Sequence, residues 1–330
     1  MTKSLGLTNT CCKVLSSMNL YGFNLLMLTS IGLGSNLSMP NWEKESYPNI
    51  DDLVLMPIFA IIFPLVRYLL DSFIFERLGK RFISGFAGSS KKGLSEVEKD
   101  VNYKRLAKFK ESAWKFVYYL TAEILALTIT YNEPWFTDTK QFWIGPDQQC
   151  WPDHKAKLKL KLLYTFAGGF YTYRLFSVSN ALLFCHGNKF SRTGSMVLAL
   201  HDASDVFLEI GKLTKYCGSE IVPSISFLIF ALSWLILRLI YFPFFIIWST
   251  SYEVLLLLDR EKTPEGPWLY YTLNTLLISL LVLHIYWWIL IYRMIVRQVE
   301  ARGKMSHDVR SGILLATFLF LQYVDKRGSV

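Results

Sequence analysis

The apolar stretch WLYYTLNTLLISLLVLHIYWWILIYRMIV, residues 268–296, decides the fold class. An α-helix needs ~20 mostly apolar residues to cross a bilayer, and this stretch is longer. Arg293 is its one charged side chain, and Trp268 stands at its start, where aromatic residues gather at membrane interfaces. The sequence therefore predicts a membrane-spanning helix here.

Five further runs in the chain are candidates for spanning helices. The clearest is Ile221–Trp248, in which Pro243 predicts a kink. The others are Leu53–Phe75, Ala113–Tyr131, Leu160–Cys185 and Ser195–Leu213. The composition is 52% hydrophobic and 18% charged, against about 25% charged in a soluble domain. Disorder and a disulfide scaffold are excluded, and we expect an all-α, polytopic membrane bundle or barrel of helices.

The net charge of +9 comes from two segments. Glu76–Lys115 holds 11 basic and 5 acidic residues, and Arg293–Arg310 holds 5 basic and 2 acidic. Segments rich in Lys and Arg next to spans stay in the cytosol, so the C-terminus is expected to be cytosolic. Such segments also suit anionic lipid headgroups. They contain no nucleic-acid motif, so we expect no nucleic-acid partner.

The same rule assigns the segments to sides of the membrane that are inconsistent with the number of predicted spans. The acidic segments Asn41–Asp52 and Asn132–Asp153 are expected in the lumen, and Lys189 and Arg192 in the cytosol. Both ends of Ser195–Leu213 then lie in the cytosol, which is impossible for one spanning helix. Either this segment does not span, or a helix is missing, or one span is wrongly assigned.

The stretch LALHDASDVFLEIGKLTKY, residues 198–216, places charges inside an apolar region. On a helix, His201 and Asp205 share a face, as do Asp202 and Asp205. Ionisable groups at membrane depth are costly and usually line a cavity or a pathway. We favour a site where a carboxylate orients a general-base histidine. The alternatives are an interfacial helix with solvated charges and, less favoured, a divalent metal site.

Two more polar residues fall inside apolar runs. His284 is interpreted as a packing residue rather than a catalyst, because a lone histidine in a span is more often satisfied by its neighbours. Arg238 is expected to pair with a carboxylate or to line a polar cavity, and snorkelling to an interface is the alternative. The sequence contains no nucleophile elbow, P-loop or dinucleotide fingerprint.

Several blocks of the sequence resemble the plant ceramide synthases, the longevity-assurance class of the TLC-domain family. They include NWEKESYP (41–48), GSMVLALHDASDVFLEIGKLTKY (194–216) and VLHIYWWILIYRM (282–294). The resemblance runs from about Asn41 to Ser311, and the block around residue 201 is the family's signature.

The resemblance implies a location, a reaction and a site. The location is the endoplasmic-reticulum membrane. The reaction is N-acylation of a sphingoid long-chain base by a fatty acyl-CoA, giving ceramide and CoA. No cofactor is implied beyond the acyl-CoA co-substrate. His201, Asp202 and Asp205 are implied to be catalytic, as part of the lining of the active site.

The resemblance breaks at Arg174–Thr193. In the family, a helix here carries an adjacent His-His pair, whereas this segment is too short for that helix and holds only His186. This is the helix that the topology lacks, so we expect the segment to be irregular or poorly packed. A second hypothesis follows: the chain is a catalytically inactive variant that dimerises with paralogues or binds lipid.

We expect four parts along the chain. Residues 1–40 form an unassigned extension, and residues 41–110 form the first membrane helix and the basic cytosolic loop. Residues 111–311 form the TLC domain, incomplete at 174–193. Residues 312–330 form an atypical tail, whose apolar run is too short to span a bilayer.

Overall fold

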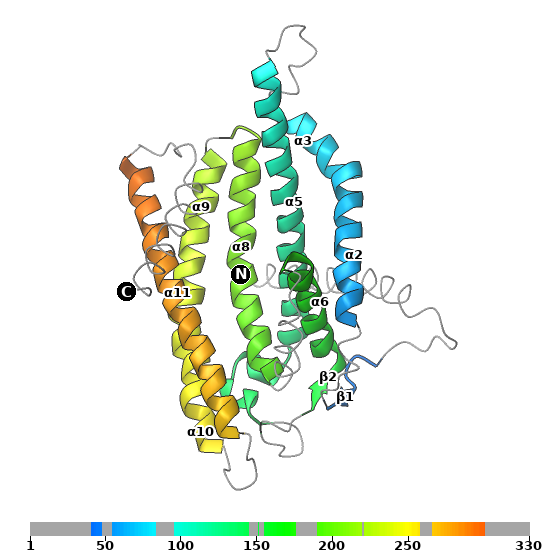
Figure 1. Cartoon of the computed structure of the whole chain (residues 1–330). Coiled ribbons are helices and arrows are strands. Elements are labelled where there is room, and N and C mark those ends of the chain that lie inside the picture. Colours follow the sequence, from blue (N-terminus) through cyan, green and yellow to red (C-terminus); the bar gives the residue numbers. More distant parts are fainter. Residues whose placement is uncertain are drawn as a thin grey trace, which may run out of the picture.

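Six long helical segments make up the part of the fold that the structure describes (Figure 1). The computed structural model describes residues 41–47, 55–83, 96–144, 151, 155–175, 190–219, 221–257 and 266–300. Within these residues, the only sheet is a pair of two-residue strands. The predicted all-α fold is therefore confirmed.

The helical segments follow one another with short elements between them. The first joins α2 (Leu55–Leu70), the π-helix η2 (Asp71–Phe75) and α3 (Glu76–Phe82); α5 (Glu96–Thr130), α6 (Leu158–Leu175) and α8 (Ser191–Tyr216) come next. The fifth joins α9 (Ile221–Trp234), the π-helices η7 (Leu235–Ile247) and η8 (Ser249–Glu253), and α10 (Val254–Leu257); α11 (Gly266–Glu300) is the last. The short elements are β1 (Glu45–Ser46), η3 (Pro134–Phe136), η4 (Thr139–Phe142) and β2 (Ala156–Lys157).

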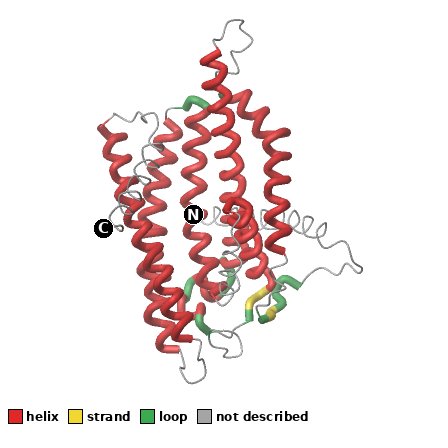
Figure 2. Tube along the Cα trace, in the orientation of Figure 1, coloured by secondary structure: helices red, strands yellow, loops and turns green. Residues whose placement is uncertain are grey.

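The helices pack side by side with α8 in the middle (Figure 2). Helix α8 contacts α5 on one side and α9 on the other, α11 packs against η7, and α2 packs against α6. The strand β2 leads directly into α6, so α6 begins at the end of the bundle that carries the strands. We call this the strand end, and the opposite one the basic end.

Three helices are long and apolar enough to cross a membrane: Leu55–Phe82, Ile221–Leu256 and Gly266–Gln298. They correspond to three of the six predicted runs, of which only residues 53 and 54 lie outside the described residues. Their outer faces expose large apolar side chains such as Ile61, Phe244 and Val282. The other predicted runs correspond to α5, to α6 as far as Leu175 and to α8, and these three helices are more polar and pack against one another. The rest of the run Leu160–Cys185 lies outside the described residues. The chain is therefore a membrane protein.

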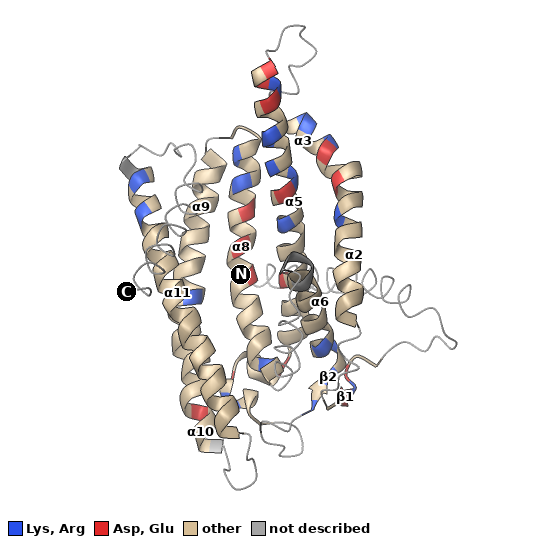
Figure 3. Ribbon diagram, viewed as in Figure 1, with Lys and Arg blue, Asp and Glu red and all other residues tan. Residues whose placement is uncertain are grey.

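Helix α5 begins well before its predicted apolar run. Its first half is polar and is supported by ion pairs one turn apart, such as Lys99–Glu96 at 2.7 Å and Lys104–Asp100 at 2.6 Å. Pairs at this spacing stabilise a helix without any apolar face, so hydropathy does not detect it. Figure 3 shows Lys and Arg at the basic end, on α3 and on the nearby ends of α5, α8 and α11.

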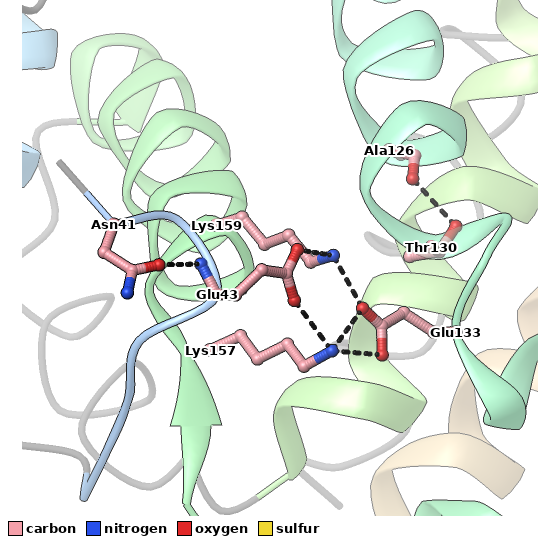
Figure 4. Close-up of polar contacts among 7 residues, drawn as sticks. All are labelled: Asn41, Glu43, Ala126, Thr130, Glu133, Lys157 and Lys159. Carbon is pink, nitrogen blue, oxygen red and sulfur yellow. Dashed lines mark hydrogen bonds and ion pairs between the residues drawn. The ribbon is translucent and has the colours of Figure 1, made fainter. Parts of the chain in front are cut away.

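At the strand end, four charged residues hold the N-terminal segment against the bundle (Figure 4). Glu43 pairs with Lys157 at 2.9 Å and Lys159 at 2.7 Å, and Glu133 pairs with the same lysines at 2.9 and 2.7 Å. The strands align Glu45 with Lys157 in antiparallel register. We call these four residues the clamp; its two lysines balance its two carboxylates.

Arg192 was expected on the opposite side of the membrane from residues 132–153, and the structure places it beside them instead. One guanidinium nitrogen, Nη1, donates to the carbonyl oxygens of Gln141 at 2.8 Å and Ile144 at 2.7 Å. The guanidinium also lies 4.8 Å from the ring centre of Trp135. Buried carbonyls and an aromatic face satisfy this cation, so a charge count assigned it to the wrong side. Helix α8 therefore begins at the strand end and reaches the basic end.

The prediction that Arg174–Thr193 is irregular is wrong at both edges of this segment. Arg174 lies in the last turn of α6, and Ser191–Thr193 form the buried first turn of α8. Residues 176–189, with His186, lie outside the described residues. Residues 1–40 and 312–330, for which we expected an unassigned extension and an atypical tail, also lie outside the described residues.

Candidate functional site

The signature stretch, residues 194–216, makes up nearly all of α8, so it is helical as predicted. Asp202 is buried with 4% of its surface exposed, and the side chain of Asp205 keeps 25%. The imidazole Nδ1 of His201 lies 2.6 Å from the carbonyl oxygen of Val197, one turn earlier. This contact fixes the ring against its own helix and turns the other nitrogen, Nε2, toward the neighbouring helices.

Arg238 of η7 connects these residues to the next helix. Its Nη2 donates to the carbonyl oxygen of His201 at 2.7 Å and lies 3.4 Å from Oδ1 of Asp205. Its guanidinium lies 3.8 Å from the ring centre of Trp234. The expected pairing with a carboxylate is confirmed. A guanidinium is always charged, so Asp205 supplies the counter-ion that it needs at this depth.

The structure brings His284 of α11 against His201. The two Nε2 atoms are 2.8 Å apart, and the ring centres are 4.8 Å apart. His284 is 2% exposed, and the aromatic rings of Phe242 and Trp234 contact it edge-on. His284 was interpreted as a packing residue; it packs, but it also makes a polar contact with the signature histidine.

Two more carboxylates border this group. Glu123 of α5 is half-buried and close enough to Asp202 to interact with it electrostatically. Glu209, one turn beyond Asp205 on α8, pairs with Lys212. The site therefore combines two histidines, several carboxylates and one guanidinium from four helices, between apolar walls. Within the described residues, no cluster of three or more His, Cys, Asp or Glu could hold a metal ion.

This arrangement suits proton transfer. A histidine whose ring is fixed by a hydrogen bond can accept a proton at its other nitrogen. Neighbouring charges and dipoles act strongly in a site from which water is excluded. The π-helix of η7 presents Arg238 toward α8, and π-helical turns are frequent at functional sites.

Comparison with known proteins gives the family. The TLC domain matches residues 108–182 and 179–293. Ceramide synthase LOH1 of Arabidopsis thaliana is 52% identical over 301 residues, which covers 85% of this chain and 97% of the relative. The chain belongs to the TLC-domain family. Ceramide synthase 1 LOH3 of the same plant is 54% identical over 308 residues, again covering 85% and 97%. Ceramide synthase 4 of Homo sapiens is 31% identical over 229 residues, with 62% of this chain and 54% of the relative covered.

The comparison also locates a difference from other TLC-domain proteins. The alignment with the LOH1 protein takes in 85% of the 330 residues, so roughly 20 of its 301 positions have no counterpart in this chain, about the length of one spanning helix. The TLC-domain match is itself divided at residues 179–182. The divided match falls within residues 174–193, the segment that was expected to lack a helix.

Of the predicted site residues, this TLC-domain chain brings His201 and Asp205 to the Arg238 side of α8, while Asp202 lies near Glu123. Sequence reasoning missed the contact with His284. The one signal for it was a histidine inside a long apolar run, because a polar group at that depth needs a partner.

Proposed function

We propose that this chain is a ceramide synthase, which joins a sphingoid long-chain base to the acyl group of a fatty acyl-CoA. The observation that carries the proposal is the convergence of His201, Asp205 and Arg238 inside an apolar bundle, in a chain whose near-full-length relatives are named ceramide synthases. Both substrates are amphiphiles, so their chains suit apolar walls and their reacting groups suit this polar interior.

The reaction exchanges one bond for another. The neutral amine nitrogen of the base attacks the thioester carbonyl carbon; the C–N bond forms and the C–S bond breaks. The amine loses a proton, and the CoA thiolate takes one up. We assign the proton transfer to the histidine and carboxylate site, with His201, Asp202 and Asp205 as its α8 members. Proton transfer by a positioned side chain contributes roughly 100-fold or more to a rate.

The test is ceramide formation in microsomes from cells that lack their own ceramide synthase, with palmitoyl-CoA and sphinganine as substrates. We expect ceramide above the empty-vector background. Asp202→Asn should lower the rate by roughly 100-fold because it removes a buried carboxylate from the site. Leu228→Ala, at an exposed apolar position of α9, is the control and should keep the rate. Equal rates for Asp202→Asn and wild type would remove Asp202 from the site.

The competing proposal is a catalytically inactive variant that dimerises with paralogues or binds lipid. It is favoured by the roughly 20 unmatched positions and by the absence of an adjacent His-His pair from the whole sequence. If this chain inserts into the microsomal membrane but makes no ceramide, the result would support the inactive variant. Co-purification with a differently tagged copy or paralogue tests the dimer.

We further propose an endoplasmic-reticulum location with the basic end and the C-terminus in the cytosol. The Lys and Arg residues at the basic end support this orientation (Figure 3). The CoA phosphates would then approach from the side where cations favour them. We also propose that the chain has the four parts predicted from its sequence: the extension (1–40), the first helix with the basic loop (41–110), the TLC domain (111–311) and the tail (312–330).

A further inference from the structure

The contact between His201 and His284 joins two histidines that are 83 positions apart. Their Nε2 atoms are 2.8 Å apart, which is hydrogen-bond distance. Two imidazole nitrogens at this distance repel when both donate or both accept. One of them therefore carries the proton, and the other supplies the lone pair.

Val197 decides which ring is the donor. Its carbonyl oxygen lies 2.6 Å from Nδ1 of His201 and only accepts hydrogen bonds. Nδ1 of His201 therefore carries a proton. A neutral imidazole has a single N–H, so Nε2 of His201 holds a lone pair. Nε2 of His284 must then be the donor, which leaves the lone pair of His284 on its Nδ1.

This Nδ1 atom is buried and has no hydrogen-bond partner among the described residues. Unsatisfied buried polar atoms are few in native proteins, and each needs an explanation. The nearby guanidinium of Arg238 is directed to the carbonyl oxygen of His201, to Asp205 and to the ring of Trp234. A buried nitrogen with a lone pair and no hydrogen-bond partner is able to accept a proton.

We propose that His284 is the base of the reaction and accepts the amine proton of the sphingoid base at Nδ1, while His201 is a positioning residue that fixes its tautomer. The inference rests on the proposed function. As the C–N bond forms, the amine proton moves to Nδ1, and His284 becomes an imidazolium that still donates to His201. The C–S electron pair leaves with sulfur, and the same proton then moves from Nδ1 to the thiolate, which restores the neutral ring.

Kinetics of matched variants distinguish the two histidines. Glutamine places an oxygen acceptor where Nε2 of His201 was, so His201→Gln should keep the rate within roughly tenfold of wild type, and His201→Ala should lose more. His284→Gln has no basic nitrogen, so kcat should fall by roughly 100-fold or more. Imidazole added to His284→Ala should restore part of the rate, and imidazole added to His201→Ala should not.

The control is Leu283→Ala, whose side chain is exposed beside His284 on α11; it should keep the rate. The opposite pattern, with His201→Gln inactive and imidazole rescue confined to His201→Ala, would overturn the assignment. Equal losses without rescue in both alanine variants, in protein that inserts normally, would show that the pair is structural and would also overturn it.

A second measurement does not require ceramide synthesis. Diethyl pyrocarbonate reacts with unprotonated imidazole nitrogens, and mass spectrometry locates the modified residue. We expect modification of His284 before His201, protection of His284 by palmitoyl-CoA and sphinganine together, and modification of His201 in His284→Ala. Modification of His201 first in the wild type would contradict the inference. An inactive chain with the expected pattern would contradict the proposed function alone.

Discussion

Gly169 determines how closely α6 approaches α2. A Cβ atom on this residue would lie 2.4 Å from Cβ of Phe59 and 3.1 Å from the carbonyl oxygen of Met56. Neither neighbour can move without moving α2, because one is the backbone and the other lies next to it. At the adjacent Gly168, a Cβ would meet only the flexible end of Met56, with Sδ at 3.3 Å.

We therefore expect Gly169→Ala to lower the free energy of unfolding by about 2 kcal/mol, the usual cost of inserting a methyl group into a packed core. Gly168→Ala is the matched control and should change it by less than about 1 kcal/mol. The measurement is the thermal unfolding midpoint of the purified protein in detergent. Equal midpoints for the two variants would show that α2 and α6 can separate.

For single residues, the sequence predicted a contact correctly where the two residues lie on one helix or where a charge needs a counter-ion. The spacing of His201 and Asp205 predicted a shared face, and an arginine in an apolar run predicted a carboxylate partner; the structure shows both. It failed for His284 because its partner lies on another helix, and helical periodicity contains no information about contacts between helices.

Among the elements, the short strands depend on the clamp for their place in the fold. Glu133 has 3% of its side chain exposed and contacts both lysines, whereas the side chain of Glu43 is 59% exposed. The pKa of Glu43 is lowered by hydrogen bonds from Lys159 and Lys157, against a smaller effect of burial. For Lys157, burial lowers the pKa, but hydrogen bonds and charges from Glu133 and Glu43 outweigh it, so the pKa is raised.

The clamp should therefore be closed near neutral pH and should open in acid. A carboxylate with a lowered pKa stabilises the fold above its ordinary pKa, and this stabilisation is lost as the pH falls through the lowered value. A lysine with a raised pKa stabilises the fold below its ordinary value, and this is lost only in strong base. Hydrogen exchange of residues 42–46 should accelerate as the pH falls below about 4, after correction for intrinsic exchange rates.

Glu133→Gln should accelerate the same exchange at neutral pH, since it leaves two partly buried lysines with one carboxylate. Breaking a buried ion pair costs more than about 1 kcal/mol. Glu43→Gln is the control and should have a smaller effect, because exposed pairs contribute about 0–1 kcal/mol. A larger effect of Glu43→Gln would show that the exposed carboxylate, not Glu133, holds the strands.

Across the whole molecule, α6 and α8 both begin at the strand end. Helix α6 follows β2, and α8 begins with Arg192 bound to the carbonyls of Gln141 and Ile144. Two consecutive helices that crossed a membrane in the same direction would need a return crossing between them, and the roughly 20 positions unmatched to the LOH1 protein are enough for one. The sequence predicted this conflict from charge alone, yet it could not place Arg192, because backbone carbonyls of a distant loop accept the hydrogen bonds of that side chain.

Cysteine accessibility in sealed microsomes tests this arrangement. Cys217 follows α8 at the basic end, and Thr137 is exposed at the strand end between η3 and η4. With the other cysteines replaced by serine, a membrane-impermeant maleimide should label Cys217 in intact vesicles, whose cytosolic face is outside. In a chain with Thr137→Cys and Cys217→Ser, labelling should appear only after permeabilisation. Labelling of both positions in intact vesicles would mean that α8 does not cross the membrane, and the reverse pattern would place the basic end in the lumen, against the charge rule.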